Sequence, residues 1–186
     1  NEQGAWDVGC VSDRLPGYRT VSNLADRQSL EELWGSTIPE TPGVGLTDII
    51  EGAASGRIKS IFLIGDSPNF SNGKLGNAIS ALDNLEFLVV CDSFLSAGAQ
   101  RADVVLPRAT FDEKDGTFTN LERRIQRLKP GKQRPNDASR PEWQVICDVA
   151  HKMGAPGFLM KTPSETMDEI AKVAPIYQNV SYRALA

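Results

Sequence analysis

The sequence predicts an α/β fold: a Rossmann-like parallel βαβαβ sheet with flanking helices, followed by an irregular or antiparallel β segment and C-terminal helices. Apolar runs of strand length at 58–64, 86–91 and 103–106 predict the sheet, because segments with helical periodicity separate them. Strands connected in this way pair in parallel through right-handed crossovers. Residues 117–119 and 124–128 alternate at period two, which is typical of exposed antiparallel strands.

The part of the chain before the sheet contains more turn signals than regular patterns. Residues 1–26 hold several glycines and a proline and are expected to be irregular. Apolar residues then recur at helical spacing over 27–34, and Gly35 is expected to end that helix. A second helix is expected to be capped by Thr47 and to end at Gly56.

The middle of the chain is predicted to supply the parallel sheet. The apolar run 58–64 reads as a strand buried on both faces, and a helix from 74 to 82 follows it. The second strand is expected at 86–91. A short helix near 96–101 then leads to the third strand at 103–106.

The last third of the chain is predicted to be mainly helical. Residues 130–141 contain three prolines and are expected to form a linker. A helix is expected from Trp143 to Met153, with an apolar face. Thr162 begins a capping box in which Pro163 takes the first helical position, and this box predicts a further helix.

Composition and charge exclude several classes of protein. The chain has 186 residues with 20 Lys and Arg against 24 Asp and Glu, a net charge of −4, which argues against general nucleic-acid binding. No apolar stretch approaches the ~20 residues of a membrane helix. No signal peptide is visible, and the chain does not begin with Met. It is therefore expected to be a piece of a longer protein or a processed chain.

Cysteine and histidine usage argues against an intrinsic metal site. Cys10, Cys91 and Cys147 lie far apart, and His151 is the single histidine. No zinc or iron–sulfur spacing is present. Scattered thiols are typical of a reduced, cytoplasmic protein. Cys91 closes an apolar run and is expected to be packed, while His151 has no partner at catalytic spacing.

The loops that follow the first two strands are the candidate binding site. Loops 65–71 and 92–96 are expected side by side, because ligands of parallel sheets bind beyond the carboxyl ends of the strands. The hydroxyls of Ser67 and Ser71 and the carboxylate of Asp92 would suit a nucleotide. The alternative is a loop that merely caps the next helix. Neither a GxGxxG motif nor a P-loop is present, so ordinary NAD and ATP sites are weakly supported.

Two further charged features have both a functional and a structural interpretation. The basic run 123–134 could neutralise a pyrophosphate, or it could guard an exposed edge strand against aggregation. Glu142 begins a helix, where the helix dipole favours a negative charge. Taken alone, each feature is explained by its structural role.

The order and spacing of several short motifs resemble the molybdopterin oxidoreductase superfamily over nearly the whole chain. The motifs are Asn1-Glu2-Gln3-Gly4, Leu15-Pro16-Gly17-Tyr18, Gly65-Asp66-Ser67-Pro68, Asp92-Ser93-Phe94, residues 102–107, residues 113–120, residues 122–126 and Arg140-Pro141-Glu142-Trp143. They are most similar to the catalytic subunit of formate dehydrogenase and to the related large iron–sulfur subunit of NADH-quinone oxidoreductase.

This resemblance implies a division of the chain. Residues 1–110 would be a Rossmann-like half-domain that binds a molybdopterin guanine dinucleotide. Residues 111–140 would be a crossover β segment of the cluster-proximal domain, and residues 141–186 its helical continuation. In the family, the cluster domain and the cysteine or selenocysteine that ligates molybdenum or tungsten lie outside this stretch. The resemblance therefore implies neither a catalytic residue nor a metal ligand here.

The resemblance also implies roles for eight residues in binding the cofactor, a bis-molybdopterin guanine dinucleotide. The family's Gly-x-Asn-Pro-x-x-Ser loop, which contacts a guanosine, matches Gly65, Ser67, Pro68 and Ser71, with Ser67 where Asn or Asp is usual. Asp92 matches an acid that faces the same nucleotide. Glu142 matches the acid, usually Asp, that takes the guanine edge. Asn120 and Arg123 match a loop near the pterin and the cluster.

The implied function is that of a cofactor-binding fragment, inactive alone, of a molybdenum or tungsten oxidoreductase. The parent would oxidise formate to carbon dioxide and pass two electrons through a 4Fe–4S cluster that this fragment does not ligate. Its partners would be the rest of the parent chain and electron-transfer subunits, in the cytoplasm or on the cytoplasmic face of a membrane complex. The alternatives are a scaffold domain of the NADH-quinone oxidoreductase subunit and a stand-alone nucleotide-binding module.

Overall fold

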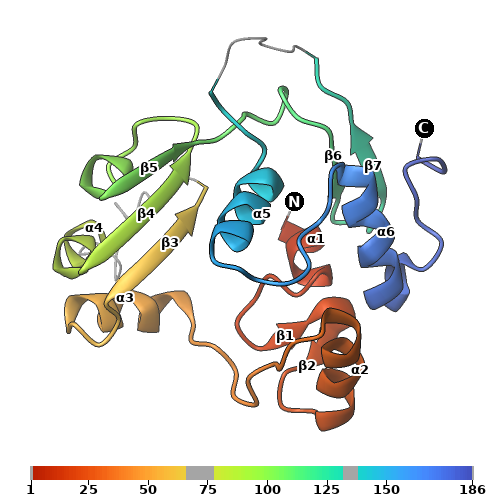
Figure 1. Ribbon diagram of the computed structural model, residues 1–186, viewed down its shortest axis with the longest axis horizontal. Helices are drawn as coiled ribbons and strands as arrows, with labels where there is room; N and C mark the ends of the chain where they lie inside the picture. The colour runs from red at the N-terminus through yellow and green to blue at the C-terminus, as the bar shows by residue number, and fades with distance from the viewer. Residues whose placement is uncertain (1, 66–77, 132–137, 186) are drawn as a thin grey trace. The chain divides into compact units, whose positions relative to one another are not determined.

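The computed structural model describes residues 2–65, 78–131 and 138–185 (Figure 1). The chain divides into two compact units. The first unit contains Asn1–Gly43, Phe111–Gln133 and Cys147–Ala186, and the second contains Val44–Thr110 and Arg134–Ile146. The mixed α/β fold class is confirmed, and the division into domains at residues 110 and 140 stays a prediction.

The second unit is built on the predicted parallel sheet. Its strands are β3 (Ser60–Ile64), β4 (Phe87–Asp92) and β5 (Val104–Pro107), in the order β3-β4-β5. Both pairs are parallel, with Phe62 opposite Val89 and Val89 opposite Val104. The carboxyl ends of the three strands consequently lie at one edge of the sheet (Figure 1).

The two faces of this sheet differ in burial. Leu88 and Val90 are fully buried, and Ile61 and Leu63 pack beside them in one cluster. On the opposite face the side chain of Phe62 is 41% exposed. The prediction that the first strand is buried on both faces is therefore wrong. The reason is that, among the described residues, β3 joins the buried cluster through Ile61 and Leu63 only, so one face of the strand is covered.

The helices of the second unit are short. Helix α3 (Leu46–Ala54) has Gly45 as its N-cap, so the prediction that Thr47 caps it is wrong. The extended backbone of Gly45 allows the helix to begin at Leu46, earlier than the pattern indicates. Helix α4 (Ala78–Ala81) continues into the 3₁₀ turn η2 (Leu82–Asn84). A second 3₁₀ turn, η3 (Ala99–Arg101), precedes β5.

The first unit begins with short elements that the sequence did not predict. Helix α1 (Glu2–Asp7) is followed by β1 (Arg14–Leu15) and β2 (Arg19–Thr20), an antiparallel pair joined by the turn η1 (Pro16–Tyr18). The prediction that residues 1–26 are irregular is therefore wrong. Elements of six and two residues are too short to show a hydrophobic period.

Helix α2 (Leu24–Trp34) confirms the helix predicted over 27–34 and begins earlier. The side-chain oxygen of Asn23 accepts hydrogen bonds from the backbone N–H groups of Ala25 and Asp26, at 2.9 and 3.2 Å. This cap satisfies two donors that the first helical turn leaves open. Gly35 ends the helix with φ +62°, a conformation that favours glycine.

The rest of the first unit matches the predicted hairpin and helices. Strands β6 (Gly116–Thr119) and β7 (Ile125–Leu128) pair antiparallel. Helix α6 (Pro163–Val173) begins at the predicted cap, where the hydroxyl of Thr162 accepts from the backbone N–H of Glu165. The turn η4 (Pro175–Tyr177) follows it. Helix α5 (Glu142–Lys152) runs from the second unit into the first.

Candidate functional site

Gly65 and Asp92 lie next to each other at the carboxyl ends of β3 and β4. The backbone N–H of Gly65 donates to the carbonyl oxygen of Cys91, at 3.0 Å. Gly65 has φ +105°, which an L side chain rarely adopts. The two strand ends are thus adjacent, as predicted. The predicted loop residues Ser67, Pro68 and Ser71 lie outside the described residues.

The Asp92 carboxylate is buried and is held by its own loop. One oxygen accepts from the backbone N–H of Ser93 at 2.7 Å and of Phe94 at 3.4 Å. The other oxygen accepts from the hydroxyl of Ser96 at 2.7 Å. A side chain that bonds the backbone immediately after it stabilises a turn. Asp92 therefore shapes the edge where β4 ends.

Glu142 is brought to the same edge by Arg108, the residue that follows β5. The backbone N–H of Arg108 donates to the carbonyl of Asp92 at 3.0 Å. Its Nη1 donates to Oε1 of Glu142 at 3.1 Å. The Arg108 and Glu142 side chains are 25% and 22% exposed, so the pair is partly shielded from water. The segment before α5 is held by a bridge between Arg108 and Arg140.

Three of the predicted residues therefore meet around a residue that the sequence analysis missed. A Cβ atom built on Gly65 would lie 3.6 Å from Nη1 of Arg108. The backbone carbonyl of Asp92 accepts a hydrogen bond from the backbone N–H of Arg108, and the Glu142 carboxylate accepts one from the Arg108 side chain. The signal for Arg108 was its position directly after Pro107, at the carboxyl end of the third strand, where ligands of such sheets bind.

Unsatisfied buried polar atoms concentrate on the same segments. Within the part of the chain that the structure describes, the buried side-chain polar atoms without a hydrogen-bond partner are Ser93 Oγ, Arg108 Nε and Trp143 Nε1. Ser93 follows Asp92, and Trp143 follows Glu142. Such atoms in a folded protein call for a ligand or an ordered water. The Arg108 side chain and the Glu142 carboxylate bonded to it fit a polar ligand that carries both acceptors and donors.

The remaining predicted residues, Asn120 and Arg123, lie in the turn between β6 and β7. The side-chain oxygen of Asn120 accepts from the backbone N–H of Arg124 at 2.9 Å, so Asn120 shapes this turn. The guanidinium of Arg123 lies 5.4 Å from the centroid of the Tyr18 ring, a cation–π contact. Both Tyr18 and Arg123 have positive φ angles, 64° and 61°. This turn belongs to the first unit, whereas Gly65, Asp92 and Glu142 belong to the second.

A buried polar network in the first unit escaped the sequence analysis. The hydroxyl of Tyr177 donates to the carboxylate of Asp7 at 3.0 Å and lies 2.6 Å from the hydroxyl oxygen of Thr119. The side-chain amide of Gln3 donates to the other Asp7 oxygen at 2.8 Å. Burial is the main cause that raises the pKa of Tyr177 to about 12. No local sequence pattern links these residues.

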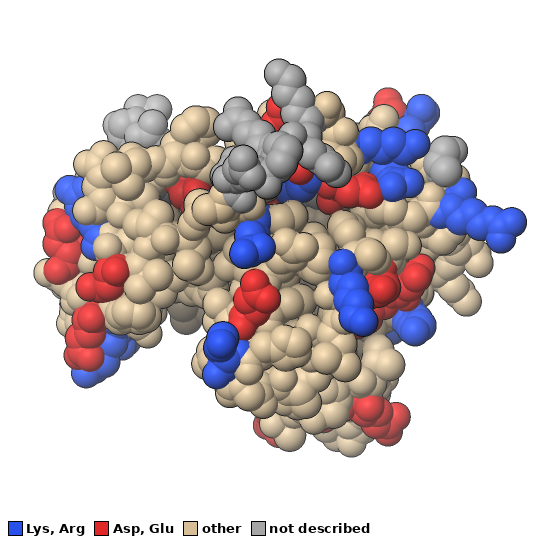
Figure 2. Space-filling view, turned by 45° about the horizontal axis from the view of Figure 1, so that its top comes forward, with Lys and Arg blue, Asp and Glu red and all other residues tan. Residues whose placement is uncertain are grey.

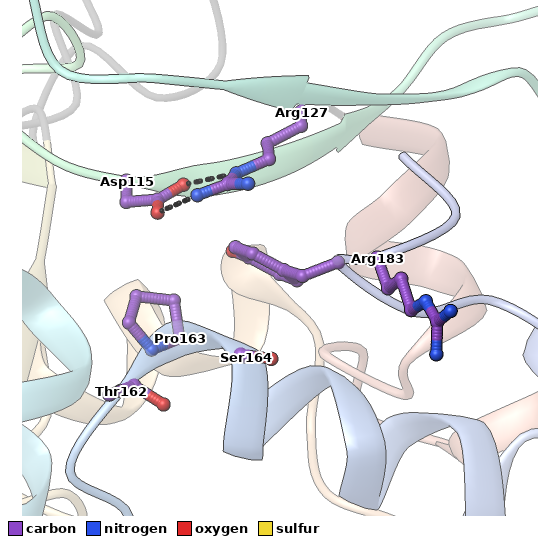
Figure 3. A pocket seen from close by; sticks show the side chains of 7 residues that line it. Asp115, Arg127, Thr162, Pro163, Ser164 and Arg183 are labelled. Atoms are coloured by element: carbon purple, nitrogen blue, oxygen red, sulfur yellow. Dashed lines mark hydrogen bonds and ion pairs between the residues drawn. The ribbon is translucent and has the colours of Figure 1, made fainter. Parts of the chain in front are cut away.

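The first unit also contains an open pocket of about 480 Å³ at the start of α6 (Figure 3). Arg127 spans the carboxylate of Asp115 with two hydrogen bonds, of 3.1 and 2.7 Å. Its guanidinium also lies 4.6 Å from the centroid of the Tyr182 ring. Figure 3 shows the side chain of Arg183 directed away from this ion pair. The cation of Arg127 is therefore already paired.

Charged side chains of both signs lie interspersed on the face shown in Figure 2. Among the described residues, no group of three or more His, Cys, Asp or Glu side chains is placed to hold a metal ion. None of the helices described is both long and apolar enough to span a bilayer. Cys91 is buried, as predicted, whereas Cys10 is exposed and Cys147 is half-buried.

The fold and the candidate site define a class: an α/β chain with polar side chains at the carboxyl ends of a parallel sheet. Residues 7–152 match the family model described as molybdopterin oxidoreductase. The chain belongs to the molybdopterin oxidoreductase family. A molybdopterin cofactor is accordingly the group that the family implies, and the donors and acceptor around Arg108 are compatible with its polar parts.

Curated relatives match the whole chain but are much longer. The chain is 44% identical over 185 residues to "Probable oxidoreductase YjgC" of Bacillus subtilis. The aligned region covers 100% of this chain and 19% of that protein. It is 42% identical to "Putative formate dehydrogenase SH0748" of Staphylococcus haemolyticus, with the same coverage of both chains. The chain thus spans about a fifth of the length of these relatives.

A solved structure shares the fold. The acetylene hydratase of Pelobacter acetylenicus superposes with a TM-score of 0.60, covering 86% of this chain and 23% of that one. The sequences are 18% identical, so this likeness concerns the fold alone.

Proposed function

We propose that this chain is the part of a formate-dehydrogenase-like molybdenum or tungsten enzyme that holds the guanosine end of one molybdopterin guanine dinucleotide. The family membership and the relatives named as formate dehydrogenases support this function. The longer polypeptide would oxidise formate to carbon dioxide. The bound pterin and its metal would supply the two-electron chemistry, and electrons would leave through an iron–sulfur cluster and electron-transfer subunits.

One observation carries the proposal: Glu142 stands at the carboxyl ends of the parallel strands, bonded to Arg108. A carboxylate can accept hydrogen bonds from N1–H and the 2-amino group of guanine together. Adenine has no such pair of donors. By analogy with bidentate base contacts, this difference would favour guanine over adenine by about 1–3 kcal/mol.

The other residues at this edge would position the nucleotide. Gly65 leaves the end of β3 without a side chain, so a ligand can approach the backbone closely. Asp92 keeps its loop in shape through the bonds to Ser93, Phe94 and Ser96. In the first unit, Asn120 and Arg123 would contribute near the pterin: Asn120 would shape the turn that presents the Arg123 cation.

The second candidate function is a scaffold domain without cofactor, as in the NADH-quinone oxidoreductase alternative, and one observation favours it. Both oxygens of Asp92 are engaged within its own loop, so they serve the fold even without a ligand. The two functions differ in one property: a scaffold needs no preference for guanine.

The test is calorimetric titration of the 186-residue chain with GMP and AMP, with the fold of each variant checked by circular dichroism. We expect GMP to bind at least several-fold more tightly than AMP. The variant Glu142→Gln should lose this preference. The variant Glu86→Gln, which removes an exposed acid paired with Lys59, is the matched control. If GMP and AMP bind equally well, or if neither binds, the result would contradict the guanosine site and favour the scaffold function.

In the longer enzyme, Glu142→Ala should lower the amount of pterin bound per polypeptide, measured as molybdenum or tungsten content. A normal metal content in a folded Glu142→Ala enzyme would contradict the assignment of Glu142.

A further inference from the structure

The pair formed by Arg108 and Glu142 presents a donor and an acceptor side by side. Nη1 of Arg108 and Oε1 of Glu142 are 3.1 Å apart. A guanidinium carries five N–H donors and no acceptor, whereas a carboxylate only accepts. Because Arg108 spends one donor on Glu142, it retains others, and its buried Nε has no partner within the described chain.

This arrangement matches one edge of guanine. Guanine presents O6, an acceptor, directly beside N1–H and the 2-amino group, which are donors. If Glu142 accepts from N1–H and the 2-amino group, guanine can be oriented with O6 or with the 2-amino group toward Arg108. Only the orientation with O6 toward Arg108 pairs its donors with an acceptor. Adenine reverses the pattern at these two positions, with an amino group in place of O6 and an unprotonated N1.

We infer that Arg108 is a specificity-determining residue that donates a hydrogen bond to O6 of the guanine base. This inference rests on the proposed function, because it requires that Glu142 face a purine. Arg108 then donates to the O6 acceptor, and Glu142 accepts from the N1–H and 2-amino donors. The amino group of adenine faces the Arg108 donors without an acceptor between them, so Arg108 selects against adenine as well as for guanine.

A merely structural Arg108 would behave differently. If the side chain only holds and neutralises Glu142, its loss should lower the affinity for every purine nucleotide that Glu142 binds by the same factor. A residue that donates to O6 should instead affect only ligands that differ at that atom. The nucleotide 6-thio-GMP isolates this difference, because it keeps the guanine donors and replaces O6 with sulfur, a weak acceptor.

The experiment titrates the 186-residue chain with GMP, 6-thio-GMP and IMP, using ligand-observed NMR to measure weak binding. IMP keeps O6 and lacks the 2-amino group, so the ratio of GMP to IMP affinity reports on Glu142. We expect the wild-type chain to bind GMP about tenfold more tightly than 6-thio-GMP. In Arg108→Met this ratio should fall to about one, while the ratio of GMP to IMP is retained.

Two further variants control the measurement. Arg108→Lys keeps a cation and a donor and should retain part of the preference for O6. Arg101→Met removes a different arginine of the second unit, which pairs with Asp83 at 2.9 Å, and should change no ratio. The amide NMR spectrum shows whether each variant keeps the native fold.

The outcomes separate this inference from the proposed function. If the wild-type chain binds none of the purine nucleotides, both the proposed function and the inference about Arg108 are contradicted. If wild type binds GMP but treats 6-thio-GMP alike, the role of Arg108 is overturned while the purine site stands. A preference for O6 that survives in a folded Arg108→Met chain overturns it equally.

Discussion

The hydroxyl of Tyr177 donates a 3.0 Å hydrogen bond to the carboxylate of Asp7, which precedes it by 170 residues. Both side chains are buried, with 3% and 2% of their surfaces exposed. This contact ties α1 to the segment after α6 within the first unit. A buried carboxylate is costly unless hydrogen bonds satisfy it, and here Tyr177 and Gln3 supply one to each oxygen.

The variant Tyr177→Phe should be less stable than wild type. It removes the donor to Asp7 and keeps the ring, so the free energy of unfolding is expected to fall by about 1–3 kcal/mol. Urea unfolding followed by circular dichroism measures the change. The matched control is Tyr182→Phe, which also alters a buried tyrosine and should cost about 0.5 kcal/mol or less. Equal effects of both substitutions would contradict the role of the Asp7 bond.

Stability should decrease in alkaline solution. Burial raises the pKa of both Tyr177 and Tyr182 to about 12, from an ordinary value of 10.0. Between these two values the unfolded chain loses protons that the folded chain keeps, so rising pH favours unfolding. The stabilisation is complete below pH 10 and is lost as pH rises toward 12.

The expected slope is about 1.4 kcal/mol per pH unit for each tyrosine. Urea unfolding at a series of pH values, in wild type and in Tyr177→Phe, measures it. The variant should have a shallower slope because one of the two groups is gone. An unchanged slope in the variant would show that Tyr177 ionises equally in both states.

The variant Gly65→Ala should destabilise the second unit. At φ +105° an alanine is strained, and its Cβ would also contact Nη1 of Arg108 at 3.6 Å. We expect a loss of about 1–3 kcal/mol in urea unfolding. Gly116→Ala is the control, since no atom lies within 4 Å of a Cβ at that position. A Gly65→Ala chain as stable as the control would argue against this strain.

Thiol labelling should distinguish Cys91 from Cys10. Cys91 is fully buried in β4, whereas Cys10 is exposed. Because Cys10 is exposed, it should react in native buffer without unfolding. A chain with Cys10→Ser and Cys147→Ser reports on Cys91 alone. Its labelling should require denaturant, and rapid labelling in native buffer would contradict the buried position of β4.

The sheet and the longer helices could be predicted because their patterns are local. The apolar residues Leu88 and Val90 mark β4, and Thr162 with Pro163 marks the start of α6. The exposure of Phe62 could not be predicted, because it depends on which face of the sheet is covered rather than on the sequence of β3.

The candidate site could be predicted in part. Family motifs indicated Gly65, Asp92 and Glu142, which the structure brings to one edge of the sheet. Arg108 directly follows the motif at residues 102–107, which was interpreted only as a strand, so its side chain was overlooked. The pairing of Asp7 with Tyr177 depends on tertiary packing across 170 residues and leaves no trace in local composition.

The way the two units share the chain has a consequence for synthesis on the ribosome. The core of the first unit joins Leu15 and Leu30 to Val173, so that core can close only after Val173 has emerged. The strands of the second unit all lie between Ser60 and Pro107 and can pair long before then. During translation the second unit can therefore fold while Leu15 and Leu30 remain without their partner Val173 and accessible to chaperones.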